Sequence, residues 1–234
     1  EGTEQMNISD GFKTGIFIRE LKNRFLCEVE IESEKMVCYV PSSCHLSNFL
    51  KLSKKEVLLV PNTSPKSKTS YALFAVPYKK NYIVLNTSMA NRAIERSISS
   101  RLFAHLGKRK NVIKEYSILG YKCDLYIEDT DTIVEIKSVI STENKAIFPT
   151  VYSERTIKQL QQLQLLLKLG KKVCFCIVSL HPYLKEVVID RNTEFYDKLK
   201  QCMDKGLRLY AYTTRLEWSK LKIEHEIPVS FTVE

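Results

Sequence analysis

Two strand-like runs joined by a short acidic turn constrain this fold more than any other stretch of the sequence. They occupy residues 123–139, CDLYIEDTDTIVEIKSV. Side chains alternate between the two faces of a strand, so Glu135 and Lys137 share one face while Ile136 points the other way. A charged pair on a strand that packs against a core costs free energy unless each charge has a partner or a chemical role.

Pairing of the two runs as a hairpin predicts a cluster of charged side chains. Asp124, near the start of the first run, then lies close to Glu135 near the end of the second, with Lys137 on the same face. Two converging carboxylates repel each other and coexist ionised most readily around a divalent cation. Their hard oxygens predict Mg²⁺ or Mn²⁺ as the cofactor, with the Ile136 carbonyl as a third ligand. Lys137 would orient an attacking water or neutralise a phosphate, which indicates a metal-dependent phosphodiesterase. The competing interpretation is an exposed edge strand whose Glu135 and Lys137 face water.

Composition favours a two-domain protein of the cytoplasm. The chain has 234 residues, of which 44% are hydrophobic, so it can bury more than one core. It contains no apolar run long enough for a transmembrane helix. Its seven cysteines are an odd number in a chain too large to need disulfide bonds, which favours a reducing cytosol. Cys174 and Cys176 lack a second pair with matching spacing, so small buried thiols are favoured over a zinc site.

The positive charge is concentrated in the first half of the chain. Residues 1–110 carry 18 Lys and Arg against 10 Asp and Glu, a net +8, whereas residues 111–234 carry 18 against 17, a net +1. A basic half joined to a neutral half fits a module that holds a polyanion beside a module that performs chemistry. A solvated basic surface is the simpler alternative.

The first part of the chain is predicted to form a small β-barrel. Short strand-like runs at regular spacing are typical of such barrels, and they occupy residues 23–31, 35–41, 56–61, 70–78 and 81–87. In the first of these runs the alternation places Phe25, Cys27, Val29 and Ile31 on one face. A helix is predicted over residues 88–106, capped by Ser88 and ended by Gly107, and a basic linker follows.

The second part alternates strands and helices, which predicts an α/β domain around a central mixed sheet. The predicted strands are residues 112–118, 122–128, 131–139, 171–180, 185–189 and 207–214. The predicted helices are residues 153–170 and 191–206. Ser153 is the expected N-cap of the first helix, and glycines end both.

Several segments, in order along the chain, resemble a known family. The spacing D-x₁₀-E-I-K from Asp124 to Lys137 looks like the signature of PD-(D/E)XK nucleases. More specifically, the whole chain resembles the sugar fermentation stimulation protein family, SfsA. The matching segments are FIRELKNRF, KTSYALFAV, NTSMANRAIERSI, EYSILGYKCDLYIE, VEIKSV and AIFPTVYSERTIKQL. Together they extend over roughly nine-tenths of the chain, which makes the resemblance specific.

The resemblance implies an α/β (α+β) protein with an OB-like nucleic-acid-binding barrel over residues 1–87. A connecting helix and basic linker would occupy residues 88–110, and a restriction-endonuclease-like domain residues 111–234. The implied activity is a metal-dependent nuclease acting on DNA, with RNA as a second candidate. The family was first regarded as a DNA-binding regulator of sugar metabolism, so a non-catalytic DNA-binding protein is the alternative.

The resemblance also suggests further catalytic and phosphate-binding residues. Glu115 resembles an acidic residue that would support the metal pair of Asp124 and Glu135, and a surface position beside Lys114 is its alternative. Arg155 falls in the first turn of the helix after the hairpin and, with Lys158, would meet a phosphate at the helix N-terminus. A solvated helix face is the equal alternative for these two.

Four residues of the barrel are candidate nucleic-acid contacts. Asn23 and Arg24 are expected to contact the strand, with a solvated barrel rim as the alternative. Lys68 and Tyr71 lie near the barrel face, where Tyr71 would stack on a base unless it packs in the core.

The sequence departs from the family pattern in two places. Where H-x-P-N followed by a Gly-Arg pair is expected, the chain has CYVPSSCHLSNFL, which weakens the prediction of nucleic-acid contacts in that loop. The residues concerned are Tyr39, Ser42, Cys44 and His45. In the later helix Thr156 and Gln159 stand where Gly and His are expected, which removes an auxiliary site residue.

A third hypothesis remains beside the nuclease and the DNA-binding protein. A basic α/β scaffold that binds a protein partner would show no salt-dependent affinity for nucleic acid, whereas the first two predict a steep fall in affinity with salt. The intact trio of Asp124, Glu135 and Lys137 favours catalysis, because a protein that only binds nucleic acid has no need of two carboxylates beside a phosphate.

Overall fold

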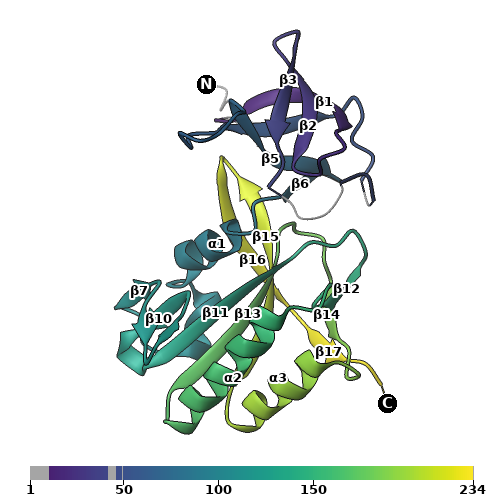
Figure 1. Ribbon diagram of the computed structural model, residues 1–234. Helices are drawn as coiled ribbons and strands as arrows, with labels where there is room; N and C mark the ends of the chain where they lie inside the picture. Colours follow the sequence, from purple (N-terminus) through teal and green to yellow (C-terminus); the bar gives the residue numbers. More distant parts are fainter. Residues whose placement is uncertain (1–10, 42–45, 49, 234) are drawn as a thin grey trace, which may run out of the picture. The chain divides into compact units, whose positions relative to one another are not determined.

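The computed structural model describes residues 11–41, 46–48 and 50–233 (Figure 1). It forms two compact units, Glu1–Met89 with Arg215–Leu221, and Ala90–Thr214 with Lys222–Glu234. Most of the segment 88–110, expected as a separate connector, therefore groups with the second unit. Residues 215–221, expected in the second domain, group with the first.

The first unit is a closed five-stranded barrel with one additional strand. Its strands are β1 (Lys13–Glu20), β2 (Leu26–Ile31), β3 (Glu34–Tyr39), β4 (Glu56–Pro61), β5 (Tyr71–Tyr78) and β6 (Asn81–Val84). β1 pairs with both β2 and β4, and the pairings β2–β3, β3–β5 and β5–β4 complete the ring. Closure leaves no free sheet edge among these five strands. The predicted small barrel is confirmed, although β1 was not anticipated.

Strand β2 shows where the predicted alternation holds and where it ends. Cys27, Val29 and Ile31 are buried in the barrel as expected. Phe25, expected on the same face, lies in the turn before β2 and keeps 37% of its surface exposed. The strand begins at Leu26, so the period-two pattern does not extend back to Phe25.

Gly15 allows β1 to pass close to the barrel core. A Cβ atom at this position would lie 2.5 Å from Cγ1 of Val29 and 3.1 Å from both the Glu30 carbonyl oxygen and Leu59 Cδ1. The 2.5 Å distance is too short for two carbon atoms, so the Val29 side chain would have to move, and the two 3.1 Å distances are tight.

We expect Gly15→Ala to lower the free energy of unfolding by about 1–3 kcal/mol through overpacking. Urea denaturation of the purified protein measures this. Ile16→Val, at a partly exposed neighbour, should change stability by less than about 1 kcal/mol and serves as the control. Equal stability of Gly15→Ala and the wild type would contradict the close packing.

The second unit contains a six-stranded mixed sheet in the order β16-β15-β13-β11-β10-β7 (Figure 1). Its strands are β7 (Val112–Lys114), β10 (Leu125–Ile127), β11 (Thr132–Val139), β13 (Lys172–Ser179), β15 (Arg208–Glu217) and β16 (Lys220–Ile227). β11, β13 and β15 are parallel, whereas β10 is antiparallel to both β11 and β7. The predicted central mixed sheet is confirmed.

Two smaller sheets complete the strands of the second unit. One is the parallel set β12 (Lys145–Phe148), β14 (Glu186–Ile189) and β17 (Val229–Phe231), and the other pairs β8 (Ser117–Ile118) with β9 (Tyr121–Lys122). The runs 112–118 and 122–128, each predicted as one strand, are therefore divided. In the first run, Glu115 has a φ of 49°, and this left-handed conformation ends β7.

Two helices cover one face of the central sheet (Figure 1). α2 (Glu154–Lys168) is capped by Ser153, whose hydroxyl accepts a hydrogen bond from the Thr156 amide at 3.2 Å. Its apolar residues at helical spacing, Ile157, Leu160, Leu163 and Leu167, are buried. α3 (Glu194–Asp204) is capped by Thr193. Their apolar faces share a core with Phe175 and Ile177 of β13.

The helix predicted over residues 88–106 is shorter than expected. α1 (Met89–Ser97) ends at Ser97, and a 3₁₀ segment follows over Arg101–Leu106. Serines compete for backbone hydrogen bonds, and the sequence Ser-Ile-Ser-Ser lies at the break. Gly107, with φ at 76°, ends the 3₁₀ segment as expected.

Candidate active site

The hairpin β10–β11 brings the predicted charged residues together. Leu125 pairs with Val134 and Ile127 with Thr132, and a single 3₁₀ turn joins the strands. The predicted hairpin is confirmed. Asp124 therefore stands at the end of β10 beside the middle of β11, where Glu135, Ile136 and Lys137 follow one another.

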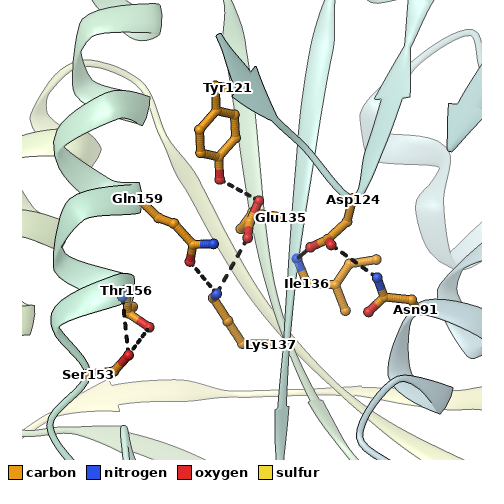
Figure 2. A network of polar contacts seen from close by, with 9 residues as sticks. All are labelled: Asn91, Tyr121, Asp124, Glu135, Ile136, Lys137, Ser153, Thr156 and Gln159. Carbon is orange, nitrogen blue, oxygen red and sulfur yellow. Dashed lines mark hydrogen bonds and ion pairs between the residues drawn. The ribbon is translucent and has the colours of Figure 1, made fainter. Parts of the chain in front are cut away.

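Asp124 is held by hydrogen bonds from two elements (Figure 2). Its Oδ2 accepts from the backbone amide of Ile136 at 2.7 Å, and its Oδ1 accepts from Nδ2 of Asn91 on α1 at 3.1 Å. β10 pairs with β11 only as far as Leu125, so the carboxylate takes the place of a backbone partner for Ile136. The side chain is thereby fixed against the edge of β11.

Glu135 is a buried carboxylate with two protein partners. Only 3% of its surface is exposed. Its Oε2 accepts a hydrogen bond from the Tyr121 hydroxyl at 2.6 Å, and its Oε1 lies 3.5 Å from Nζ of Lys137. Burial, followed by repulsion from Asp124, raises the pKa of Glu135 to about 7, while Tyr121 and Lys137 act in the opposite direction. The two carboxylates are thus close enough to affect each other's charge.

Lys137 connects the strand to helix α2 (Figure 2). It lies on the same face of β11 as Glu135, and its Nζ donates a hydrogen bond to Oε1 of Gln159. The Lys137 side chain remains 20% exposed. The ammonium group is therefore oriented by two partners while it keeps access to solvent.

Three residues of this network were not among the predicted site residues. Tyr121 carried no signal in the sequence that set it apart from a core tyrosine. Asn91 is the second Asn of the N-T-x-x-x-N segment, so the motif contained the signal. Gln159 was noted as a departure from the expected His, and the structure places it in contact with Lys137.

Glu115 does not join the carboxylate pair. Its left-handed backbone turns it out of β7, its side chain is 75% exposed, and Oε1 lies 3.4 Å from Nζ of Lys122. Only its backbone amide approaches the site, donating to the Asp124 carbonyl oxygen at 2.9 Å. The structure places this carboxylate on the surface, as in the alternative, and not beside Asp124 and Glu135.

The predicted phosphate contacts on α2 lie on the exposed side of that helix. Arg155 is exposed, and Lys158 forms an ion pair with Glu154 one turn earlier, with 3.1 Å between Nζ and Oε1. Neither residue has a hydrogen bond to the carboxylate pair among the contacts of the described residues. Their geometry fits the solvated helix face that was the alternative.

The predicted contacts of the barrel all lie in the first unit. Asn23 accepts a hydrogen bond from the Phe25 amide at 3.0 Å, and the Arg24 guanidinium lies over the Phe25 ring. Lys68 lines a surface groove beside Tyr39. Tyr71, the first residue of β5, is half-buried. Ser42, Cys44 and His45 lie outside the described residues.

Cys174 and Cys176 are free, buried thiols on β13, with their Sγ atoms 3.6 Å apart. Across the described residues, no group of three or more His, Cys, Asp or Glu side chains is arranged to hold a metal ion. A divalent ion between Asp124 and Glu135 would therefore need further ligands from the backbone and from water.

The donors around the carboxylate pair fit a hard divalent cation. Asp124 and Glu135 supply carboxylate oxygens, each of which can accept more than one contact. The N–H and C=O of a strand residue point to the same side, so the Ile136 carbonyl faces the same edge as its amide, where Asp124 lies. A cation would also offset the repulsion that raises the pKa of Glu135. Few protein ligands and several waters are what Mg²⁺ prefers.

Comparisons with known proteins cover nearly the whole chain. A sequence model described as the sugar fermentation stimulation protein RE domain matches residues 88–220, and one described as the SfsA N-terminal OB domain matches residues 20–85. The sugar fermentation stimulation protein homolog of Ruminiclostridium cellulolyticum is 27% identical over 223 residues, covering 93% of this chain and 96% of the relative. The homolog of Shewanella pealeana is 25% identical over 219 residues, covering 89% and 93%.

A solved structure shares the fold. The structure of Pyrococcus furiosus SfsA in complex with Ca²⁺ matches with a TM-score of 0.75 and 20% identity, covering 94% of this chain and 96% of that one. Together the matches confirm the predicted order of an OB barrel followed by a mixed-sheet domain. No helix in the described part of the chain has the length and apolar character needed to cross a membrane.

Proposed function

This chain belongs to the SfsA family of sugar fermentation stimulation proteins, and we propose that it is a divalent-metal-dependent nuclease of the PD-(D/E)XK type. Its substrate would be DNA, with RNA as a second candidate. The observation that carries this proposal is the arrangement on β11, where the Asp124 carboxylate bonds to Ile136 between Glu135 and Lys137.

Each residue of the hairpin has a distinct task in this proposal. Asp124 and Glu135 would hold Mg²⁺ or Mn²⁺, with the Ile136 carbonyl as a further oxygen ligand. Such an ion, when bound, lowers the pKa of a coordinated water and stabilises charge on a phosphodiester. Lys137 donates hydrogen bonds from a fixed position, so it orients the attacking water or neutralises the phosphate.

The surrounding residues keep these groups in place. Tyr121 donates to Glu135 and favours its ionised form, which is the form that binds a cation. Gln159 restrains the Lys137 ammonium from α2, and Asn91 restrains Asp124 from α1. Fixed donors and acceptors reduce the reorganisation needed during reaction.

Two further observations support the proposal. The Pyrococcus furiosus SfsA was solved with Ca²⁺, which is also a hard divalent cation with oxygen ligands. The net charge of this chain is +9, as a polyanion-binding protein requires.

A non-catalytic DNA-binding protein, with a regulatory role in sugar metabolism, is the second candidate. The observation in its favour is that both carboxylates already have protein partners, from Ile136 and Asn91 for Asp124 and from Tyr121 and Lys137 for Glu135. A network with this many internal contacts holds together without an ion. The two candidates differ in whether phosphodiester bonds are broken.

Cleavage of labelled single-stranded DNA, duplex DNA and RNA, in Mg²⁺, Mn²⁺ or EDTA, decides between them. We expect cleavage with either metal, none in EDTA, and a loss of about 10²-fold for Lys137→Ala, because a preorganised charge contact is removed. Lys168→Ala, at an exposed lysine of α2, is the matched control and should retain full activity. Salt-sensitive binding without cleavage in any metal would instead support the DNA-binding protein. Cleavage that survives Lys137→Ala unchanged would place the active site elsewhere.

A further inference from the structure

Two aromatic rings lie side by side on the surface of the barrel. Phe25 and Tyr39 are 37% and 39% exposed, their ring centroids are 6.5 Å apart, and their planes differ by 18°. The Arg24 guanidinium carbon lies 4.9 Å from the centroid of Phe25. Two near-parallel rings and a guanidinium form a flat apolar surface with a positive charge, which we call the aromatic platform.

Backbone pairing fixes the platform. Phe25 immediately precedes β2 and Tyr39 ends β3, where Leu26 and Tyr39 are paired residues. The Val40 amide donates to the Phe25 carbonyl oxygen at 2.8 Å, which extends the pairing past the end of β3. The Asn23 side chain accepts from the Phe25 amide and fixes the turn. The rings are therefore held on paired strands before any ligand binds.

A basic groove adjoins the platform. It has a volume of about 380 Å³ and is lined by Leu26, Tyr39 and residues of the loop between β4 and β5, including Lys66 and Lys68. None of the described residues that line it is acidic. A hydrogen bond joins the two ends of this loop, where Nδ2 of Asn62 donates to the Thr69 hydroxyl at 3.1 Å. Tyr39 belongs to both features, so the apolar surface and the positive charges are contiguous.

We propose that the aromatic platform and this groove bind an unpaired stretch of nucleic acid. Bases would stack on Phe25 and Tyr39, with Arg24 contributing a second stacking plane, and the backbone phosphates would meet Lys66 and Lys68. The face of β2 and β3, together with the loops β1–β2 and β4–β5, is where OB folds generally bind oligonucleotides. The proposal rests on the proposed function and narrows its substrate to single-stranded segments, because the faces of paired bases are covered by their neighbours.

The chemistry of the groove favours this ligand over a protein. Stacking accepts every base, and two lysines among the described lining residues, none of which is acidic, suit a chain of phosphates. Tyr39 stands where the family pattern has His, so this ring is a feature of the present chain. Tyr71, which the sequence suggested as the stacking residue, is half-buried at the start of β5 and does not line the groove.

Fluorescence anisotropy of the full chain in EDTA, where cleavage is suppressed, tests the proposal. The probes are labelled oligo-dT and oligo-U of about 12 nucleotides, within the usual site size of one OB fold, and a duplex of equal length. We expect Tyr39→Leu and Phe25→Leu each to weaken binding of both single strands about 10-fold. Binding of the duplex should change by less than about 2-fold. Tyr39→Phe keeps the ring and should retain the affinity of the wild type.

The salt dependence separates stacking from charge contacts. Tyr39→Leu should leave the slope of log affinity against log salt unchanged, whereas Lys66→Ala with Lys68→Ala should reduce it. Unchanged single-strand affinity in both leucine variants overturns the proposal, as does an equal loss for duplex and single strand. Absence of wild-type binding to any nucleic acid overturns the proposal and the nuclease together.

The failure of the proposed nuclease would be visible separately, in cleavage of the same oligonucleotides with Mn²⁺. A wild type that binds them through Tyr39 but does not cleave them keeps the platform and removes the nuclease. Circular dichroism of each variant checks that the barrel is folded.

Discussion

Asp124→Asn is expected to lower metal-dependent cleavage by roughly 10³-fold at a Mn²⁺ concentration that just saturates the wild type. A bound ion supplies several kcal/mol of charge stabilisation in the transition state, and this stabilisation is lost when the ion is not held. Each loss of about 1.4 kcal/mol slows the reaction about tenfold. Asparagine has nearly the same shape as aspartate, and its carbonyl oxygen can still accept the hydrogen bond from Ile136. The substitution therefore removes the negative charge and keeps the contact with Ile136, while its new NH2 group faces Asn91, whose amide must turn its oxygen toward it.

The comparison with Glu115→Gln makes this prediction specific. The Glu115 carboxylate is on the surface beside Lys122, and a surface ion pair contributes little. We expect cleavage by Glu115→Gln to stay within about 2-fold of the wild type. A loss in Glu115→Gln as large as that in Asp124→Asn would show that Glu115 moves to the metal during reaction. Full activity of Asp124→Asn would rule out the proposed ligand set.

Initial rates over a range of Mn²⁺ concentrations provide the measurement. If Asp124 holds the ion, higher Mn²⁺ should recover part of the lost rate, whereas a folding defect would not respond to metal. Thermal melting in EDTA provides the control for folding. We expect the two variants to melt close to the wild type, because Glu115 is exposed and a turned Asn91 amide can accept from the new NH2 group of Asp124→Asn.

The core of the site was predictable because it depends on local pairing. Asp124 and Glu135 are separated by one short hairpin, and alternation along β11 places Glu135 and Lys137 on one face whatever the rest of the chain does. Strand β13 was predictable as a short continuous apolar run, and α2 was predictable because its apolar residues recur at helical spacing.

The residues that hold the site were harder to predict because they come from other elements. Tyr121, Asn91 and Gln159 reach the hairpin from β9, α1 and α2. The N-T-x-x-x-N segment marked Asn91, but nothing in the sequence indicated which residue it would contact. The position of the Glu115 side chain was hard to predict for a local reason. The left-handed conformation of Glu115 interrupts the strand that was expected to direct this side chain. The backbone conformation at this one position places the Glu115 carboxylate on the surface.

The barrel shows the same limits. β1 was missed because Gly15 interrupts its alternation, and its role becomes visible only when β2 and β4 pair on either side of it. Phe25 was assigned to the same face as Cys27, Val29 and Ile31 because it continues the period of β2, yet the strand begins one residue later. That one-residue difference leaves Phe25 partly exposed, as half of the aromatic platform.

Glu135→Gln is expected to change the pH dependence of stability more than any other substitution in the site. Glu135 has its pKa raised to about 7 in the folded protein, against 4.5 in the unfolded chain. The folded state therefore binds this proton more tightly. Its contribution to stability is present in full below pH 4.5 and is lost as the pH rises toward 7.

The expected size follows from the difference between the two pKa values. At about 1.4 kcal/mol for each pH unit, the wild type loses about 3 kcal/mol from this group across that interval. Glutamine does not titrate, so the stability of Glu135→Gln relative to the wild type should rise by the same amount. Urea denaturation in EDTA at pH 5 and pH 8 measures the change, and Glu128→Gln, at an exposed residue of the hairpin turn, should show none.

Metal provides the second half of this experiment. If Glu135 and Asp124 hold a divalent ion, Mn²⁺ at pH 8 should stabilise the wild type, by about 2.7 kcal/mol when its concentration is 100 times the dissociation constant. Glu135→Gln should gain much less, because it lacks one charged ligand. A wild type whose stability relative to Glu135→Gln is the same at both pH values would show that Glu135 ionises normally. Equal stabilisation of Glu135→Gln and the wild type by Mn²⁺ would show that Glu135 is not a ligand of the ion.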